Sequence, residues 1–245
     1  MKYLDTPCLA RISAFLDNVD VGDYSVHGDL EAYSCKLAGL DKKLSRNLDQ
    51  EVQMGSSPLE LSKSPVGPLA ESASRKTLIY LILTLNHCYP DYDFSLLRAH
   101  HFRKEPGVSA VEQAVDAHLL EASRVWEATP GCGGAPFLDT LWTAVDEAIE
   151  LPDCDVYSYK SDGEADPFGE KGSVWSFNFF FYNRKLRRIL YFACRGIAKT
   201  ALADSSAGEA SRTPGATADS ADADSADGLN ESDSARYGMA GTMEV

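Results

Sequence analysis

The sequence predicts an α+β protein: a mostly antiparallel central sheet flanked by helices, with a long mobile internal loop and a disordered acidic C-terminal tail. Residues 174–195 are rich in aromatic and β-branched side chains and predict a pair of strands. Helical stripes of apolar residues precede this pair at 75–87, 111–125 and 138–149. Strands joined by hairpins, with helices inserted between them, favour this class over an alternating parallel fold.

The first predicted elements are a helix and a small hairpin. Apolar residues at positions 9, 12, 15 and 16 share one face of a short amphipathic helix over 9–16. Strand-favouring residues at 24–27 and 30–37 flank the turn-forming pair Gly28-Asp29. We therefore expect a hairpin that turns at Gly28.

Two helices are predicted in the middle of the chain. Residues 75–87 are Leu-rich and apolar nearly all round, which indicates a buried helix that ends before Pro90. Ser109 and Glu112 have the spacing of a capping box, so the next helix is expected to start there. Its apolar stripe runs over 111–125.

A further helix, a strand and the aromatic strand pair complete the domain. Pro136 suits a first helical turn, and the stripe at 138–149 follows it. Residues 156–159 predict a short strand, and Asn183-Arg184 supplies the turn of the strand pair. The alternating side chains divide between two buried faces: Trp175, Phe177, Phe179 and Phe181 on one, Phe180 and Tyr182 on the other. This pattern predicts a central position in the sheet.

The segment 45–73 predicts a long mobile loop inside the domain. It contains Pro58, Pro65 and Pro68 and no aromatic residue, and its leucines show no sustained period. Only its N-terminal end is compatible with a helix. We expect no core side chains here, so that deletion of 46–72 would leave the thermal stability nearly unchanged.

The charge distribution separates a domain at 1–197 from a tail at 198–245. The whole chain has a net charge of −14, and residues 201–245 contain nine acids and two bases. Such a tail buries too little apolar area to offset a backbone entropy cost of about 1–2 kcal/mol per residue, so we predict disorder. The charge makes direct DNA binding unlikely, and neither a membrane span nor a secretory signal is recognisable.

Residues with catalytic or metal-binding potential form no recognisable motif. The chain has no Gly-rich phosphate loop, no GxSxG element and no CxxC pair, and its six cysteines are expected to be free thiols. Asp91, Asp93, His100 and His101 are the best metal-like cluster, but their spacing matches no metal motif. We expect neither a cofactor nor a metal. A metal-dependent hydrolase using Asp91, Asp93 and His100 remains an alternative.

Four bases occur within five residues at Arg184, Lys185, Arg187 and Arg188. They fit a nuclear-import signal or a contact for an acidic partner. They also fit a charged hairpin end that prevents edge pairing, and the sequence does not choose between these interpretations.

The segment 45–73 has the composition of a regulatory segment. Ser57-Pro58 and Ser64-Pro65 are Ser-Pro pairs, and Ser62 stands close to the second. A phosphate adds about −1.5 to −2 charges, which could repel an acidic partner or mask a basic patch. Ser57, Ser62 and Ser64 are therefore the candidate phosphorylation sites.

Three blocks of sequence together resemble one protein family. They are SRKTLIYLILTLNHCYPDYDFS (74–95), LWTAVDEAIELPDCDVYSY (141–159) and DPFGEKGSVWSFNFFFYNRKLRRILYF (166–192), with LEAYSCKLAG (30–39) in support. This combination resembles the eukaryotic Maf-type repressors of RNA polymerase III transcription. The residues that carry the match most specifically are Asp91, Tyr92, Asp93, Phe94, Asp166, Pro167, Phe168, Gly169, Trp175, Phe177 and Asn178.

The resemblance implies a regulator that is not an enzyme. Such proteins bind RNA polymerase III and block recruitment of TFIIIB through its B-related factor and TATA-binding protein, which lowers tRNA and 5S RNA synthesis under stress. Kinases inactivate them by phosphorylating a loop like 45–73, a phosphatase reverses this, and the protein moves between cytoplasm and nucleus. By position, LSKSP (61–65) matches the phosphorylated stretch and RKLRR (184–188) a nuclear signal. We expect a monomer; an α+β adaptor without a polymerase role is the alternative.

Overall fold

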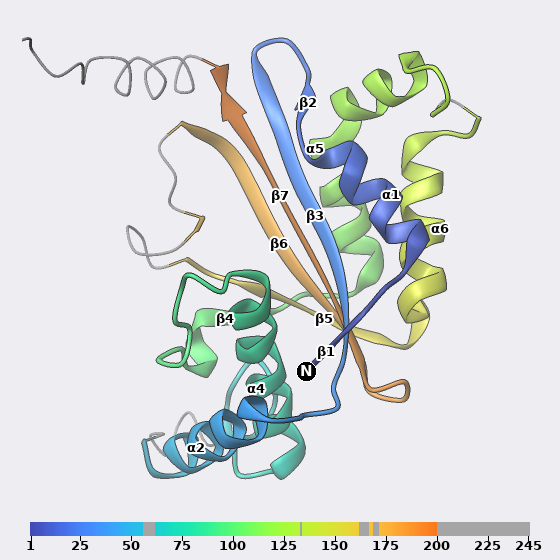
Figure 1. Ribbon diagram of the computed structural model, residues 1–245. Helices are drawn as coiled ribbons and strands as arrows, with labels where there is room; N and C mark the ends of the chain where they lie inside the picture. The colour runs from blue at the N-terminus through green and yellow to red at the C-terminus, as the bar shows by residue number, and fades with distance from the viewer. Residues whose placement is uncertain (56–61, 133, 162–166, 169–171, 200–245) are drawn as a thin grey trace, which may run out of the picture. The chain divides into compact units, whose positions relative to one another are not determined.

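The computed structural model describes residues 1–55, 62–132, 134–161, 167–168 and 172–199. No helix within these ranges is long and apolar enough to cross a membrane. Figure 1 shows the elements in chain order. They are β1 (Lys2–Leu4), α1 (Pro7–Leu16), β2 (Val19–Asp20), β3 (Tyr24–Ser34), α2 (Leu40–Gly55), α4 (Ser72–Cys88), η1 (Ala99–His101), β4 (Phe102–Lys104), α5 (Val108–Ala128), α6 (Phe137–Ile149), η2 (Leu151–Asp153), β5 (Cys154–Tyr159), β6 (Ser173–Asn183) and β7 (Arg188–Ala198).

One seven-stranded sheet organises the described residues, which confirms the predicted α+β class. Its order is β1-β3-β7-β6-β5-β4. The short strand β2 also pairs with β3, outside this path. Every strand pair is antiparallel. The long strands β3, β6 and β7 form the centre, and β7 runs one residue into the predicted tail, at Ala198. The rest of that tail, from residue 200, lies outside the described residues.

The predicted hairpin at Gly28 is wrong, because β3 is one continuous strand. It pairs with β7 along its whole length, from Tyr24 opposite Ala198 to Ser34 opposite Arg188. A Cβ at Gly28 would lie 2.9 Å from Cys194 Sγ and 3.2 Å from Leu16 Cβ. The glycine therefore allows α1 to pack closely on the strand, and its role is not a turn.

The first face of the sheet is covered by α1, α5 and α6 (Figure 1). Phe177 and Phe181 of β6 point into this core, as the predicted alternation requires. The predicted capping box is wrong: Gly107 is the N-cap of α5, so Ser109 is already the second helical residue and Glu112 the fifth. The helix still buries the expected stripe, because the register of its apolar residues does not depend on the cap.

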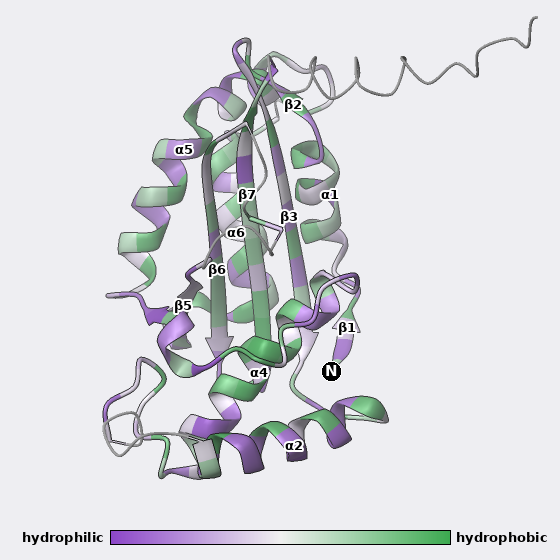
Figure 2. Cartoon of the chain, turned by 90° about the vertical axis from the view of Figure 1, so that its left-hand side faces the viewer, coloured by the Kyte–Doolittle hydropathy of each residue, from purple (hydrophilic) through white to green (hydrophobic). Residues whose placement is uncertain are grey.

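The second face carries α2 and α4, with Phe180 and Tyr182 of β6 in its core. Figure 2 looks onto this face and shows α4 and α2 in front of the lower part of the sheet. No described helix stands in front of the upper parts of β3, β6 and β7. The two faces are therefore covered unequally.

The prediction of a core-free loop at 45–73 is also wrong for the residues that the structure describes. Leu48 and Val52 of α2 and Val66 and Leu69 beyond it are all at most 3% exposed. Arg75 clamps this segment, because its Nη1 donates to the carbonyl oxygen of Leu69 at 2.9 Å. The only sequence signal was the i, i+4 spacing of Leu48 and Val52 among many polar residues.

Candidate partner-binding site

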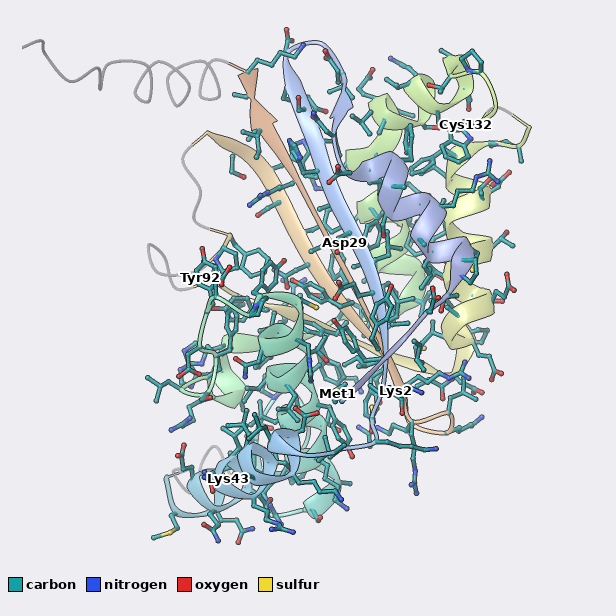
Figure 3. All side chains as sticks on the ribbon, viewed as in Figure 1. Met1, Lys2, Asp29, Lys43, Tyr92 and Cys132 are labelled. Atoms are coloured by element: carbon teal, nitrogen blue, oxygen red, sulfur yellow. The ribbon has the colours of Figure 1, made fainter. Side chains whose placement is uncertain are left out.

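A cleft of about 390 Å³ opens on the uncovered part of the second face. We call it the aromatic cleft. Figure 3 labels two of its lining residues, Asp29 on β3 and Tyr92 on the turn that follows α4. Its lining includes Asp17, His27, Asp29, Cys88, Tyr89, Tyr92, Pro167, Phe168, Tyr191 and Arg195.

Tyr89 is the centre of the aromatic wall. Its ring centroid lies 5.5 Å from that of Phe168, 6.2 Å from Tyr191 and 6.5 Å from Tyr92. These edge-on arrangements are favourable for aromatic pairs. The wall is thus held by mutual packing, while Tyr92 remains 42% exposed and available to a partner.

The turn after α4 displays Tyr92 through local hydrogen bonds. Asn86 Oδ1 accepts a hydrogen bond of 3.0 Å from the backbone N–H of Phe94, and Asp93 Oδ1 accepts one of 2.9 Å from Ser95. Hydrogen bonding from the Ser95 side chain, with this backbone bond, lowers the pKa of the Asp93 carboxyl. Phe94 is 4% exposed and anchors the turn in the core. The predicted motif 91–94 therefore builds a platform on which only Tyr92 presents a large apolar surface.

Acidic and hydroxyl groups surround Cys88 and Asp29, two residues that line the cleft. The Tyr33 hydroxyl donates to Glu31, and Cys88 Sγ lies 3.1 Å from the same carboxylate. Burial, with the nearby Glu31 charge, raises the pKa of the Cys88 thiol well above its usual value, so this thiol stays protonated. The Asp29 side chain keeps an exposed surface, yet partial burial raises the pKa of its carboxyl. These groups suit binding by hydrogen bonds and charge better than nucleophilic chemistry.

The third sequence block supports the cleft from behind. Asn178 fixes the end of β5, because its Oδ1 accepts from Tyr159 N at 2.7 Å and its Nδ2 donates to Tyr159 O at 3.2 Å. Trp175 stacks on His118 at 4.8 Å and on Phe177 at 5.9 Å. Pro167 and Phe168 reach the cleft itself. The matching residues Asp166 and Gly169 lie outside the described residues.

The residues weighed for a metal site do not converge. Among the described residues, no group of three or more His, Cys, Asp or Glu side chains is placed to hold a metal ion. Asp91 and Asp93 are exposed on the turn, and Asp93 is engaged with Ser95. His100 and His101 stack on each other at 4.0 Å. This geometry gives no support to the hydrolase alternative.

The candidate phosphorylation sites have different environments. Ser62 is exposed, whereas Ser64 is half-buried and donates its hydroxyl hydrogen to the carbonyl oxygen of Gly67. Ser57 lies outside the described residues. Because Ser62 is exposed and Ser64 is half-buried and bonded to Gly67, we expect Ser62 to be modified more readily.

The basic hairpin is partly neutralised by its surroundings. Arg184 Nε lies 3.1 Å from an Asp155 carboxylate oxygen, and Lys185 Nζ lies 2.7 Å from Asp153. Arg188 Nη1 donates to the carbonyl oxygen of Ala148 at 3.2 Å. The four bases thus point into different environments, and both the partner-contact and the edge-protection interpretations remain compatible with them.

Two cations that sequence reasoning missed stand near this hairpin. Lys36 and Lys76 line a hollow of about 420 Å³ together with Arg184 and Arg187. No local motif could reveal this grouping, because the three segments are far apart in the sequence and meet only in the fold. We call this second concavity the basic hollow.

The fold and these two concavities define the class of the molecule. It is an α+β protein whose sheet is covered by helices on one face and only partly covered on the other. Its concavities present aromatic, acidic and basic groups without a convergent catalytic cluster among the residues that the structure describes. This is the composition of a protein that binds partners.

Comparison with known proteins identifies the family. Residues 26–193 match the family described as Maf1 regulator. A Dictyostelium discoideum protein named repressor of RNA polymerase III transcription is 34% identical over 81% of this chain and 86% of its own length. A Schizosaccharomyces pombe protein named repressor of RNA polymerase III transcription maf1 is 34% identical over 81% and 84%.

A solved structure agrees with the sequence comparisons. The crystal structure of citrus MAF1 is 43% identical, covers 78% of this chain and 99% of its own, and superposes with a TM-score of 0.65. The chain therefore belongs to the Maf1 regulator family.

Proposed function

We propose that this chain represses transcription by RNA polymerase III and that the aromatic cleft contacts the polymerase. The observation that carries the proposal is the match over residues 26–193 to a family whose curated relatives are named as repressors of this polymerase. The cleft is an aromatic concavity to which the sequence blocks that carry the resemblance contribute Tyr89, Tyr92 and Phe168.

Charge favours a protein surface over DNA as the contact. A net charge of −14 opposes binding to phosphate backbones, since affinity for DNA scales with the number of phosphates that cations neutralise. Carboxylates at Asp17 and Asp29 beside the exposed ring of Tyr92 suit a segment with basic and apolar side chains. We infer that repression works by occlusion: the bound protein blocks recruitment of TFIIIB through its B-related factor and TATA-binding protein.

Phosphorylation is the proposed control. Modification of Ser57, Ser62 or Ser64 by kinases would inactivate the protein, and a phosphatase would restore it. The exposure of Ser62 supports access by a kinase. The hairpin bases at 184–188 serve as the proposed nuclear-import signal, so that localisation between cytoplasm and nucleus follows the phosphorylation state.

Direct binding tests the proposal and its site together. Purified RNA polymerase III is titrated onto the immobilised full chain, its Tyr92→Ala variant and a Leu96→Ala control. Leu96 is 77% exposed and follows Tyr92 on the same connection, but it does not line the cleft. We expect the Tyr92 variant to bind about tenfold more weakly, as truncation of a central aromatic contact does, and the control to bind like the parent.

Two results would contradict the proposal in different ways. Retained DNA binding without polymerase binding would reject the polymerase role and favour the adaptor. Equal polymerase binding by the parent and the Tyr92 variant would keep the partner but reject the cleft as its site.

A further inference from the structure

The basic hollow is a second concavity, at the end of the sheet where β3 ends and β6 turns into β7. Lys36 follows β3, Arg184 and Arg187 belong to the β6–β7 turn, and Lys76 lies in the first turns of α4. Their side chains are exposed, and no acidic residue lines the hollow. Four positive charges thus gather at one place on a chain whose net charge is −14.

Most of these charges are uncompensated. Within the described ranges, Lys36, Lys76 and Arg187 form no ion pair, whereas Arg184 shares Asp155 with Lys104. Like charges that surround one space repel each other, and the field inside a concavity is stronger than on a flat surface. The hollow therefore has an electrostatic preference for an anion.

An uncharged donor also lines the hollow. Tyr182 is 7% exposed, and its hydroxyl forms no hydrogen bond with the residues that the structure describes. The hydroxyl oxygen is not among the fully buried polar atoms, so it is accessible from the hollow as a donor to a bound ligand. The ring of Tyr182, part of the core of the second face, also positions Arg184, whose Cζ lies 5.9 Å from the ring centroid.

Backbone geometry adds one feature that favours anions and one that positions Arg187. The 17-residue helix α4 begins at the hollow with Ser72 and Ala73, so the positive end of its dipole faces this side. Arg187 has a φ of 52°, a left-handed conformation that is uncommon for a non-glycine residue. Its carbonyl oxygen accepts a 2.9 Å hydrogen bond from Cys35 N, which holds the arginine beside Lys36.

We propose that the basic hollow binds a phosphate group. A phosphate monoester carries nearly two negative charges and three acceptor oxygens, which fits several cations and a hydroxyl from separate segments better than a single carboxylate does. The phosphate comes either from a small soluble anion or from a phosphoserine in a protein segment. This inference does not depend on a polymerase role for the aromatic cleft.

Titration with two probes distinguishes the sources. The probes are inorganic pyrophosphate and a short Gly/Ala peptide with one central phosphoserine, each titrated by calorimetry into the full chain at fixed ionic strength. The test variant is Lys36→Gln/Lys76→Gln. The control, Lys42→Gln/Lys43→Gln, removes two exposed lysines of α2 that do not line the hollow (Figure 3 labels Lys43).

We expect at least one probe to bind the parent and the control equally, and the test variant to lose about tenfold or more in affinity. Tyr182→Phe, which removes only the hydroxyl, should weaken binding severalfold and leave the melting temperature nearly unchanged. Binding of pyrophosphate alone would assign the hollow to a soluble anion, and stronger binding of the phosphopeptide would assign it to a protein segment.

Two results would overturn the proposal. One is that neither probe binds the parent. The other is that the Lys36/Lys76 and Lys42/Lys43 variants weaken binding equally, which would show a general effect of net charge.

Discussion

The two faces of the central sheet show how unequal helical coverage creates binding surfaces. On the first face, α1, α5 and α6 cover β3, β6 and β7, and the strands' side chains there are core. On the second face, α2 and α4 cover only the lower part, and the aromatic cleft opens above them. Successive side chains of β6 point alternately into the cores on the two faces. A surface for partners thus arises where helical cover stops, without a separate domain.

Deletion of 46–72 has the largest expected effect on this comparison. It removes Leu48, Val52, Val66 and Leu69 from the second face and leaves the first face intact. Each buried aliphatic side chain contributes about 2–5 kcal/mol, so the loss of four is comparable with the whole 5–15 kcal/mol that stabilises a typical domain. We expect loss of the cooperative melt in circular dichroism, and an unchanged melting temperature would show that this segment is not part of the core.

Single truncations compare the two faces on equal terms. Leu69→Ala on the second face and Leu119→Ala on the first each remove a leucine that is at most 1% exposed. Both should cost about 2–5 kcal/mol in urea unfolding, because each leaves a cavity. Leu96→Ala, at an exposed position, should change stability by less than about 0.5 kcal/mol. A Leu69 effect as small as that of Leu96 would mean that the second face is loosely packed.

Substitution of Asn178 tests the side-chain hydrogen bonds that join β6 to the end of β5 behind the cleft. Asn178→Ala leaves the Tyr159 N–H and carbonyl groups without their side-chain partner, at a cost of about 1–3 kcal/mol. Ser176→Ala, at an exposed position on the same strand, is the control and should be close to neutral. If both variants unfold at the same urea concentration, the side-chain bonds to Tyr159 do not contribute.

The smallest expected effect is a pH dependence at the cleft. Because burial raises the pKa of Asp29 in the folded state, the stability that this group contributes is present below its unfolded pKa and is lost as pH rises through the folded pKa. Asp29→Asn should therefore raise the melting temperature at pH 7, and the gain should vanish toward pH 4. Asp23→Asn removes an exposed carboxylate and controls for net charge. A gain that grows on acidification would reverse the sign of the shift.

Sequence patterns predicted the elements whose side chains repeat regularly. The stripes of α1, α4, α5 and α6 and the alternation in β6 are long enough to define both element and face. Gly28 was misassigned, because its role depends on Cys194 and Leu16, which only the fold brings near. The packed segment at 62–71 was missed because two isolated apolar residues, Val66 and Leu69, produce no period.

The binding surfaces were predicted only in part, for a related reason. The family-like blocks identified Tyr92, Phe168 and Arg184, but not that the first two line one cleft. Tyr92 and Phe168 come from segments that are distant in the sequence. Lys36 and Lys76 lie near Arg184 only because β3, β6 and β7 pair in one sheet and α4 packs against it. Motifs predict which residues matter, whereas the concavity that they form depends on long-range pairing.

The most direct test of the account is transcription of a tRNA gene in vitro by purified RNA polymerase III and TFIIIB. Unphosphorylated parent protein, the Tyr92→Ala variant and the Leu96→Ala control are added in parallel, with an RNA polymerase II template as the specificity control. We predict repression of the tRNA gene alone by the parent and the control, with repression weakened in the Tyr92 variant. Absence of repression by the parent, or equal repression of both templates, would contradict the account.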